Sequence, residues 1–280
     1  KSYQPERMTR TMQYMSNFLA SEGYYHPVLT PIITTDTIKN EWRTTVTMQV
    51  ALNKKTIIDT VTFQLSDPIL QSIALKNKEA SYLKKGQAFS DEGINNELDR
   101  LVGLFRANGF YNFTKEKIFA EVDTIDASLM VLQLDPLSQI TQVAEANAKN
   151  DQNPSWKISI QLRNLSKEIT KQYSIGQQLF YSDVPVLSNP DSILTNAPLK
   201  RDTLANLVHL YTIPKFKTSV FKQQAFIQNG SLFNETSYYQ TLNNISSLGA
   251  WQQADGRTTL MNDSVYLHYF LVPNIRRSVN

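Results

Sequence analysis

Apolar and polar residues alternate with the period of a helix in the stretch 86–111, GQAFSDEGINNELDRLVGLFRANGFY. Ser90 can cap the first free N–H groups of this helix, Asp91 and Glu92 suit its positive start, and Gly109 can adopt the left-handed conformation that closes it. We therefore predict a capped amphipathic helix. Its apolar residues step by four, three and four positions, which places them on one face: Ile94, Leu98, Leu101 and Phe105.

The same pattern occurs three times along the chain. Gly109 lies 86 residues after Gly23, and that offset places Met8, Met12, Met15 and Leu19 on the four apolar positions. Gly230 and Phe233 lie 144 residues after Gly86 and Phe89, and that offset aligns Tyr238, Leu242 and Ile245 with the stripe. The third closing glycine, Gly249, comes four residues early, which is about one helical turn, so the stripe stays in phase.

Two candidate strands follow each of these helices, at 28–35 and 44–52, at 117–123 and 128–134, and at 251–253 and 265–272. Apolar residues alternate with polar ones in 44–52 and 265–272, which predicts half-buried strands. A complete unit also has an opening strand, at 56–65 or 156–162, and a first helix, after the cap Asp67 or at 217–228. The predicted unit is strand, helix, helix, strand, strand.

These elements predict an α+β protein of three tandem units: 1–53, incomplete at its N-terminus, then 54–136, and 155–273 after a linker at 137–154. An insertion at about 164–215 interrupts the last unit, and we expect loops there with one or two strands around 204–211. Residues 274–280 lead away from it. Because Lys1 begins in mid-repeat, we expect the chain to be a fragment of a longer protein.

Composition and motifs narrow the possible classes of function. The chain is 41% hydrophobic and 19% charged, which is typical of a folded soluble protein, and its net charge of +3 is too mild to indicate nucleic acid. It has no cysteine, no nucleotide-binding glycine motif and no G-x-S-x-G motif, and His26, His209 and His268 lack partners at metal-ligand spacing. We predict no catalytic residue, no cofactor and no metal site, and hence no enzyme.

Two weaker signals allow both a structural and a functional interpretation. Asp91 and Glu92 could be paired carboxylates, but their place in a first helical turn favours a role as partners of the helix dipole. The aromatics after the closing glycines could stack RNA bases, but anchoring the helix to the sheet is the favoured role. These aromatics are Tyr24, Tyr25, Phe110, Tyr111 and Trp251.

Six of the fourteen aspartates precede Ser or Thr and then an aliphatic residue. Asp and Thr favour turns and strand ends, which accounts for part of this excess. The pattern also resembles the D-[ST]-aliphatic signal for O-glycosylation of exported proteins in one group of Gram-negative bacteria. The candidate acceptors are Thr37, Thr60, Thr124, Ser192, Thr203 and Ser264.

The motif G-x-x-F-[SN], then L-x-x-[LI] and G-[FY]-[YF], in this order of elements resembles the POTRA domain. It is carried by Gly86, Phe89, Ser90, Leu98, Leu101, Gly109, Phe110 and Tyr111, and repeated by Gly230, Phe233, Asn234, Leu242, Ile245, Leu248 and Gly249. The tandem array is similar to the periplasmic part of BamA/TamA-superfamily outer-membrane assembly proteins, and the run around 84–124 is most similar to the lipoprotein TamA-like branch, TamL. The resemblance implies an elongated array of three-stranded mixed sheets, each packed under two helices, with a membrane β-barrel after Asn280.

The resemblance also implies a mechanism, in which a sheet edge pairs with an extended client or accessory chain. The predicted edges comprise Val28, Thr30, Ile32, Thr34, Lys117, Phe119, Glu121, Asp123, Trp251, Gln252 and Gln253. The leading expectation is a non-enzymatic scaffold at the periplasmic face of the outer membrane that binds unfolded outer-membrane proteins. A POTRA array of a two-partner secretion transporter and an unrelated α+β nucleic-acid-binding module stay as alternatives.

Overall fold

The structure is a computed structural model that describes residues 4–38, 41–123, 154–163, 170–184, 199–205 and 207–274. The chain divides into two compact units, Lys1–Arg100 with Ile118–Arg163, and Leu101–Lys117 with Asn164–Asn280. The described strands form three sheets, one for each of the three sequence repeats. The fold is α+β, with β-α-α-β-β units built on mixed sheets.

The first repeat consists of helix α1 (Pro5–Ser21) and the antiparallel hairpin β1 (Val28–Ile38) and β2 (Glu41–Ala51). Pro5 stands in the first turn of α1, where its missing N–H costs nothing. The predicted stripe Met8, Met12, Met15 and Leu19 is half-buried, and no residue of α1 is fully buried.

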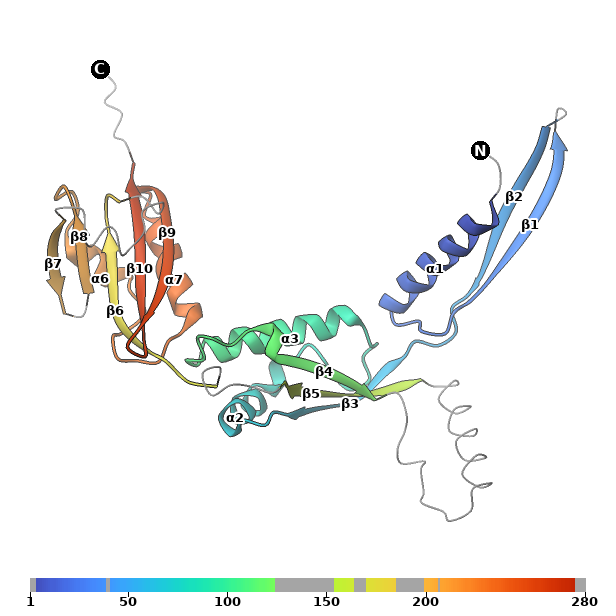
Figure 1. Cartoon of the computed structure of the whole chain (residues 1–280), viewed down its shortest axis with the longest axis horizontal. Coiled ribbons are helices and arrows are strands. Elements are labelled where there is room, and N and C mark those ends of the chain that lie inside the picture. Colours follow the sequence, from blue (N-terminus) through green and yellow to red (C-terminus); the bar gives the residue numbers. More distant parts are fainter. Residues whose placement is uncertain are drawn as a thin grey trace, which may run out of the picture. The chain divides into compact units, whose positions relative to one another are not determined.

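The second repeat holds a three-stranded sheet of β3 (Ile57–Gln64), β5 (Ser155–Leu162) and β4 (Ile118–Asp123), in that order. Its helices are α2 (Pro68–Lys76) and α3 (Asp91–Arg106), with short 3-10 turns η1 (Lys78–Ala80) and η2 (Lys115–Lys117). β3 runs parallel to β5 and β4 runs antiparallel to it. The Asp91–Arg100 part of α3 lies along one face of this sheet (Figure 1).

The strand pairing corrects one sequence expectation. The stretch 156–162 was expected to open the third unit, but it is β5, the central strand of the second sheet. Its inward residues Ile158 and Ile160 are 1% and 0% exposed, because both neighbouring strands and the helices cover them. The expected strand at 128–134 lies outside the described residues, as does the expected linker up to residue 153. Residues 124–153 therefore interrupt the second repeat between β4 and β5.

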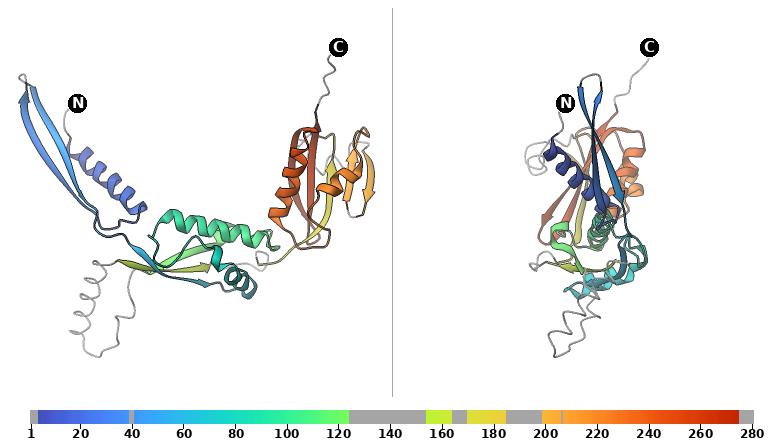
Figure 2. Two further views of the ribbon diagram at one scale, coloured as in Figure 1. Left: turned by 180° about the vertical axis from the view of Figure 1, so that it is seen from behind. Right: turned by 90° about the vertical axis from the view of Figure 1, so that its right-hand side faces the viewer.

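The third repeat has a five-stranded sheet in the order β7-β8-β6-β10-β9. Its strands are β6 (Ser174–Tyr181), β7 (Lys200–Leu204), β8 (Leu207–Tyr211), β9 (Trp251–Met261) and β10 (Ser264–Pro273). Helices α6 (Thr218–Gln224) and α7 (Glu235–Ser247) lie on one face of it (Figure 2). The opening strand β6 thus falls inside the stretch assigned to the insertion, and the hairpin β7-β8 extends the sheet beyond β6.

Side-chain caps begin α2, α3 and α7, as their sequences predict. Asp67 accepts from the N–H groups of Ile69 and Leu70 at 2.9 and 3.0 Å. Ser90 Oγ accepts from Gly93 N–H at 3.1 Å, and Asn234 Oδ1 accepts from Ser237 N–H at 2.9 Å. Each cap satisfies N–H groups that a first helical turn leaves without a partner.

Candidate docking edges and the repeated junction

The three segments named as edges from the sequence lie at or beside sheet borders. β4 and β9 are the end strands of their sheets, and β1 pairs with β2 alone in a two-stranded sheet. Among the described residues, no strand pairs with the outer side of β4 or β9. Their outer backbone N–H and C=O groups can therefore accept another extended chain.

The side chains at these edges differ in how exposed they are to a partner. Val28, Thr30, Ile32 and Thr34 are exposed on β1, as are Glu121 and Asp123 on β4 and Gln252 and Gln253 on β9. Phe119 is half-buried, and Lys117 lies in η2 just before β4. Trp251 turns into the core against Phe216, with ring centroids 4.0 Å apart, so only its backbone can serve the edge.

A second repeated structure lies where each closing glycine meets the next opening strand. The carbonyl of Gly23 accepts from Thr56 N–H at 2.9 Å, and the carbonyl of Gly109 accepts from Tyr173 N–H at 2.8 Å. Both glycines have positive φ, +93° and +97°. This left-handed turn points the carbonyl away from the finished helix, which leaves it free to accept from the next repeat.

The aromatic residues after these glycines pack against two different repeats. Phe110 packs edge-on against Phe105 of its own helix, with centroids 6.4 Å apart. Tyr111 packs edge-on against Phe233 of the third repeat at 5.1 Å, and its hydroxyl lies 2.7 Å from Thr258 Oγ1. Phe110 therefore packs on the helix that it follows, while Tyr111 joins the next repeat. That these residues anchor the helix to its sheet stays a prediction.

Tyr25 occupies the equivalent position in the first repeat. It packs against Phe89 at 5.5 Å and Trp156 at 4.4 Å, both of the second repeat. Burial, together with the nearby Asp91 carboxylate, raises the pKa of Tyr25 to about 12, so this hydroxyl stays neutral at physiological pH. Phe89 is 3% exposed, and Tyr25 and Trp156 are half-buried against it, which supports packing between two repeats as the role of these rings.

No family model and no curated protein sequence matches the chain. Among solved structures, it is similar to POTRA domains 3–5 of Haemophilus influenzae BamA, with 12% identity over 97% of this chain and 82% of that one, and a TM-score of 0.46. It is also similar to Haemophilus ducreyi BamA lacking POTRA domains 1–3, with 10% identity over 78% of this chain and 29% of that one, and a TM-score of 0.43. A third is the N-terminal domain of Omp85 from Thermosynechococcus elongatus, with 11% identity, 96% and 84% coverage, and a TM-score of 0.30.

Two of the three histidines, His209 and His268, are buried and bonded to neighbouring side chains, whereas His26 is exposed. His209 is fully buried, with Ser182 Oγ 2.9 Å from Nε2 and Thr218 Oγ1 3.2 Å from Nδ1. Burial lowers the pKa of His209, and Asp202 and Asp183 only partly oppose this. His268 is buried between Tyr181 and Thr259. Within the described residues, no group of His, Asp or Glu side chains could hold a metal ion, and no helix is long and apolar enough to cross a membrane.

The candidate glycosylation sites have unequal exposure. Thr37, Thr60 and Thr203 are exposed on strands β1, β3 and β7, whereas Ser264 is half-buried at the turn between β9 and β10. Thr124 and Ser192 lie outside the described residues. Three of the six acceptors are thus placed where an enzyme could reach the hydroxyl, and their modification stays a prediction.

Sequence reasoning missed one polar contact at the border of the second sheet. Gln71 of α2 donates from Nε2 to the carbonyl of Phe63 at 2.8 Å and accepts at Oε1 from Leu65 N–H at 2.9 Å. A glutamine one turn into a helix is common, and its spacing alone gives no signal that the side chain reaches a strand.

Proposed function

We propose that the chain is the periplasmic POTRA scaffold of an outer-membrane protein assembly or translocation factor of the BamA/TamA superfamily. It binds unfolded outer-membrane proteins or accessory chains by strand addition, carries out no chemistry itself, and hands clients to a membrane β-barrel. Within that superfamily we propose the TamL branch, on the basis of the sequence run that contains α3.

One observation carries this proposal. Both complete repeats share the strand order first, third, second: β3-β5-β4 in one and β6-β10-β9 in the other. In each, the second strand is the border strand, with its outer side unpaired among the described residues. Backbone pairing reads little side-chain sequence, which suits a scaffold that handles many clients.

The test compares a proline substitution with an alanine substitution in the same edge strand. Alternate N–H groups of a strand point outward, so one of the neighbours Phe119 and Ala120 donates away from β5. Proline at that outward position removes the edge donor and leaves the ladder to β5 intact. With such prolines in β1, β4 and β9 together, we expect crosslinking to an unfolded outer-membrane protein to be abolished, whereas alanine at Phe119, which keeps the N–H, should retain crosslinking.

The same pair of substitutions is made at Gln252 and Gln253 of β9, and amide spectra identify the proline variants that keep the fold. Folded proline variants of β1, β4 and β9 that still crosslink to clients as well as the unmodified chain does would overturn the mechanism. Capture of a soluble exported protein instead of a barrel precursor would assign the array to secretion.

A further inference from the structure

The strands β3 and β6 are the same strand in two repeats, residue for residue. The carbonyl of Ile58 accepts from Gly86 N–H at 2.7 Å, and the carbonyl of Ile175, 117 residues later, accepts from Gly230 N–H at 2.8 Å. An irregularity in the register follows both residues, after Ile58 in β3 and after Ile175 in β6. Each position of β3 can therefore be compared with the position 117 residues further on.

The outer edges of the two strands have different neighbours. In the third repeat, β8 pairs parallel with β6 from Gln178 to Tyr181, and Ser182 N–H donates to the carbonyl of Leu210 at 3.1 Å. The counterpart of Ser182 is Leu65, whose N–H donates instead to Oε1 of Gln71 at 2.9 Å. The side-chain amide of Gln71 thus stands where a peptide group of β8 stands in the other repeat.

Gln71 covers only one end of the β3 edge. Because the Phe63 carbonyl points outward to Gln71, and alternate residues of a strand point the same way, the N–H and C=O of Val61 also point outward. Val61 is the counterpart of Gln178, where β8 begins to pair. A groove of about 400 Å³ lies at this place, between Val61 and Phe63 on one side and Ser81 and Leu83 on the other.

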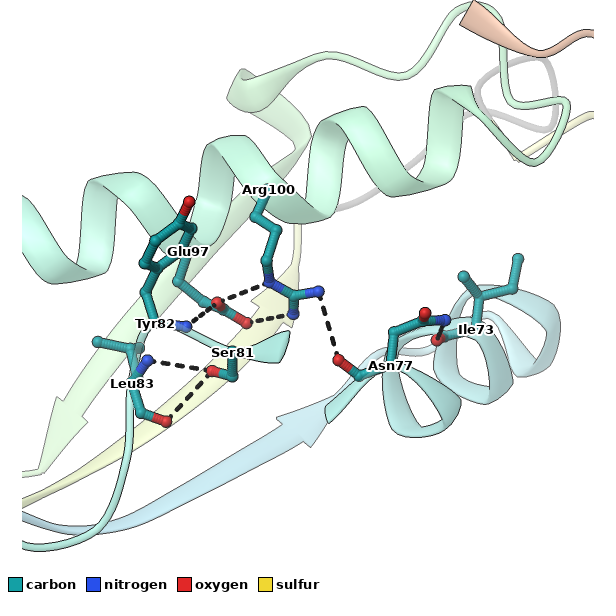
Figure 3. A network of polar contacts seen from close by, with 7 residues as sticks. All are labelled: Ile73, Asn77, Ser81, Tyr82, Leu83, Glu97 and Arg100. Atoms are coloured by element: carbon teal, nitrogen blue, oxygen red, sulfur yellow. Dashed lines mark hydrogen bonds and ion pairs between the residues drawn. The ribbon is translucent and has the colours of Figure 1, made fainter. Parts of the chain in front are cut away.

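The far wall of the groove is held by a buried ion pair (Figure 3). Arg100 donates to both carboxylate oxygens of Glu97, at 2.9 and 2.6 Å, and Glu97 accepts from Tyr82 N–H at 2.9 Å. Ser81 Oγ accepts from Leu83 N–H at 3.1 Å, which fixes the next step of the same loop. The groove is therefore bounded by a braced loop.

The two sides of the groove differ in polarity. Phe63 and Leu83 are 6% and 5% exposed, so an incoming side chain on the helix side meets apolar surface. On the other face of the sheet, the neighbouring Thr62 and Gln64 are exposed. Charged residues of both signs line the rim, and two of them pair, Lys85 with Asp59 at 3.4 Å; the set is Lys78, Lys84, Lys85, Asp59 and Glu79. An extended segment fits here if it is apolar on one face and polar on the other.

We propose that the outer edge of β3 at Val61–Gln64 is a second docking site, which takes an amphipathic extended segment of a client chain parallel to β3. Gln71 gives up its two hydrogen bonds to the peptide groups of that segment. The position of β8 on β6 shows that this edge geometry accepts a parallel strand, and strands of membrane barrels have the required alternation. The inference rests on the proposed function for its client, but the site is separate from the second-strand edges, so the two sites can be tested apart.

The test uses a soluble eight-residue peptide in which valine alternates with threonine and glutamate, added to the isotope-labelled whole chain. We expect amide shifts at Val61–Leu65. Gln71→Ala removes the competing amide and its two hydrogen bonds, so it should tighten binding at least about fivefold, the effect of one net hydrogen bond. Ser72→Ala, an exposed change in the same helix, is the matched control and should change nothing.

The second control alters the peptide and leaves the protein unchanged. N-methylation of alternate peptide groups on the bonding side removes their donors and should abolish the shifts. Shifts that persist with the methylated peptide, or unchanged affinity in Gln71→Ala, would overturn the proposal and leave Gln71 as an edge cap. Shifts confined to β4 or β9 would also overturn it, while supporting the edges of the proposed function.

Discussion

Replacing Arg100 with leucine should destabilise the second repeat far more than the loss of a surface ion pair would. The Glu97 side chain is 0% exposed and that of Arg100 is 15% exposed. In the variant, Glu97 keeps the hydrogen bond from Tyr82 N–H but loses both guanidinium bonds. A buried carboxylate is then left without a counter-charge, at a position that water cannot reach.

Breaking a buried ion pair on one side costs about 3–5 kcal/mol, against about 0–1 kcal/mol for an exposed pair. Removing both charges, with Glu97→Leu and Arg100→Leu together, leaves only Tyr82 N–H without its acceptor. An unsatisfied N–H costs about 1–3 kcal/mol. We therefore expect the double variant to be more stable than Arg100→Leu alone.

Native-state hydrogen exchange at the amides of Ile158 and Ile160 in β5 measures the free energy of unfolding of the second repeat alone. The amides of Leu267 and Tyr269 in β10 provide an internal reference and should keep their protection. The reasoning would be refuted if Arg100→Leu lost less than about 1 kcal/mol of stability in the second repeat, or if the double variant were less stable than the single one.

Three further predictions concern other positions. Burial lowers the pKa of His209, so the neutral imidazole is favoured in the folded state. The stability of the fold should therefore be constant above the ordinary pKa of about 6.5 and fall as the pH drops below it. Calorimetry at pH 7.5 and 5.5 should show a smaller loss of stability in His209→Gln than in the unmodified chain. Gly109→Ala, at φ +97°, should cost about 1–2 kcal/mol in denaturant unfolding, whereas Gly103→Ala, in a helix with open space around it, should stabilise the chain by about 0.5–1 kcal/mol. If the exposed acceptors are glycosylated, the natively expressed chain will exceed its polypeptide mass of 32.0 kDa by whole sugar units; the bare mass would exclude this.

The sequence predicts the local elements because their signals are local. The caps Asp67, Ser90 and Asn234 each lie within three residues of the N–H groups that they satisfy. The left-handed conformation of Gly109 was also predicted, since a left-handed closing residue is usually glycine. What these signals fix is the order of helices and strands within a repeat.

Strand partners were harder to predict, because alternation shows that a segment is a strand without showing which strands it pairs with. Trp156 to Leu162 has the pattern of a strand, and only the pairing with β3 and β4 places it in the second sheet. The run Leu207–Tyr211 is buried throughout, which is typical of an interior strand, yet its parallel pairing with β6 depends on residues far away in the sequence. The Gln71 contact depends on how α2 lies against β3, which no local signal determines.

The edge strands in this chain are covered to different extents, and this supports a docking role. A free strand edge invites unwanted pairing, so proteins usually cover or blunt it. The first-strand edges are covered here, by β8 over Gln178–Tyr181 of β6, and on β3 by Gln71 at one end and by the backbone of Gly86 and Gln87 at the other. Within the described residues, β4 and β9 carry no such cover. The second-strand borders stay the predicted client-binding edges, and on β3 an incoming strand would have to displace Gln71 before it could pair along the whole edge.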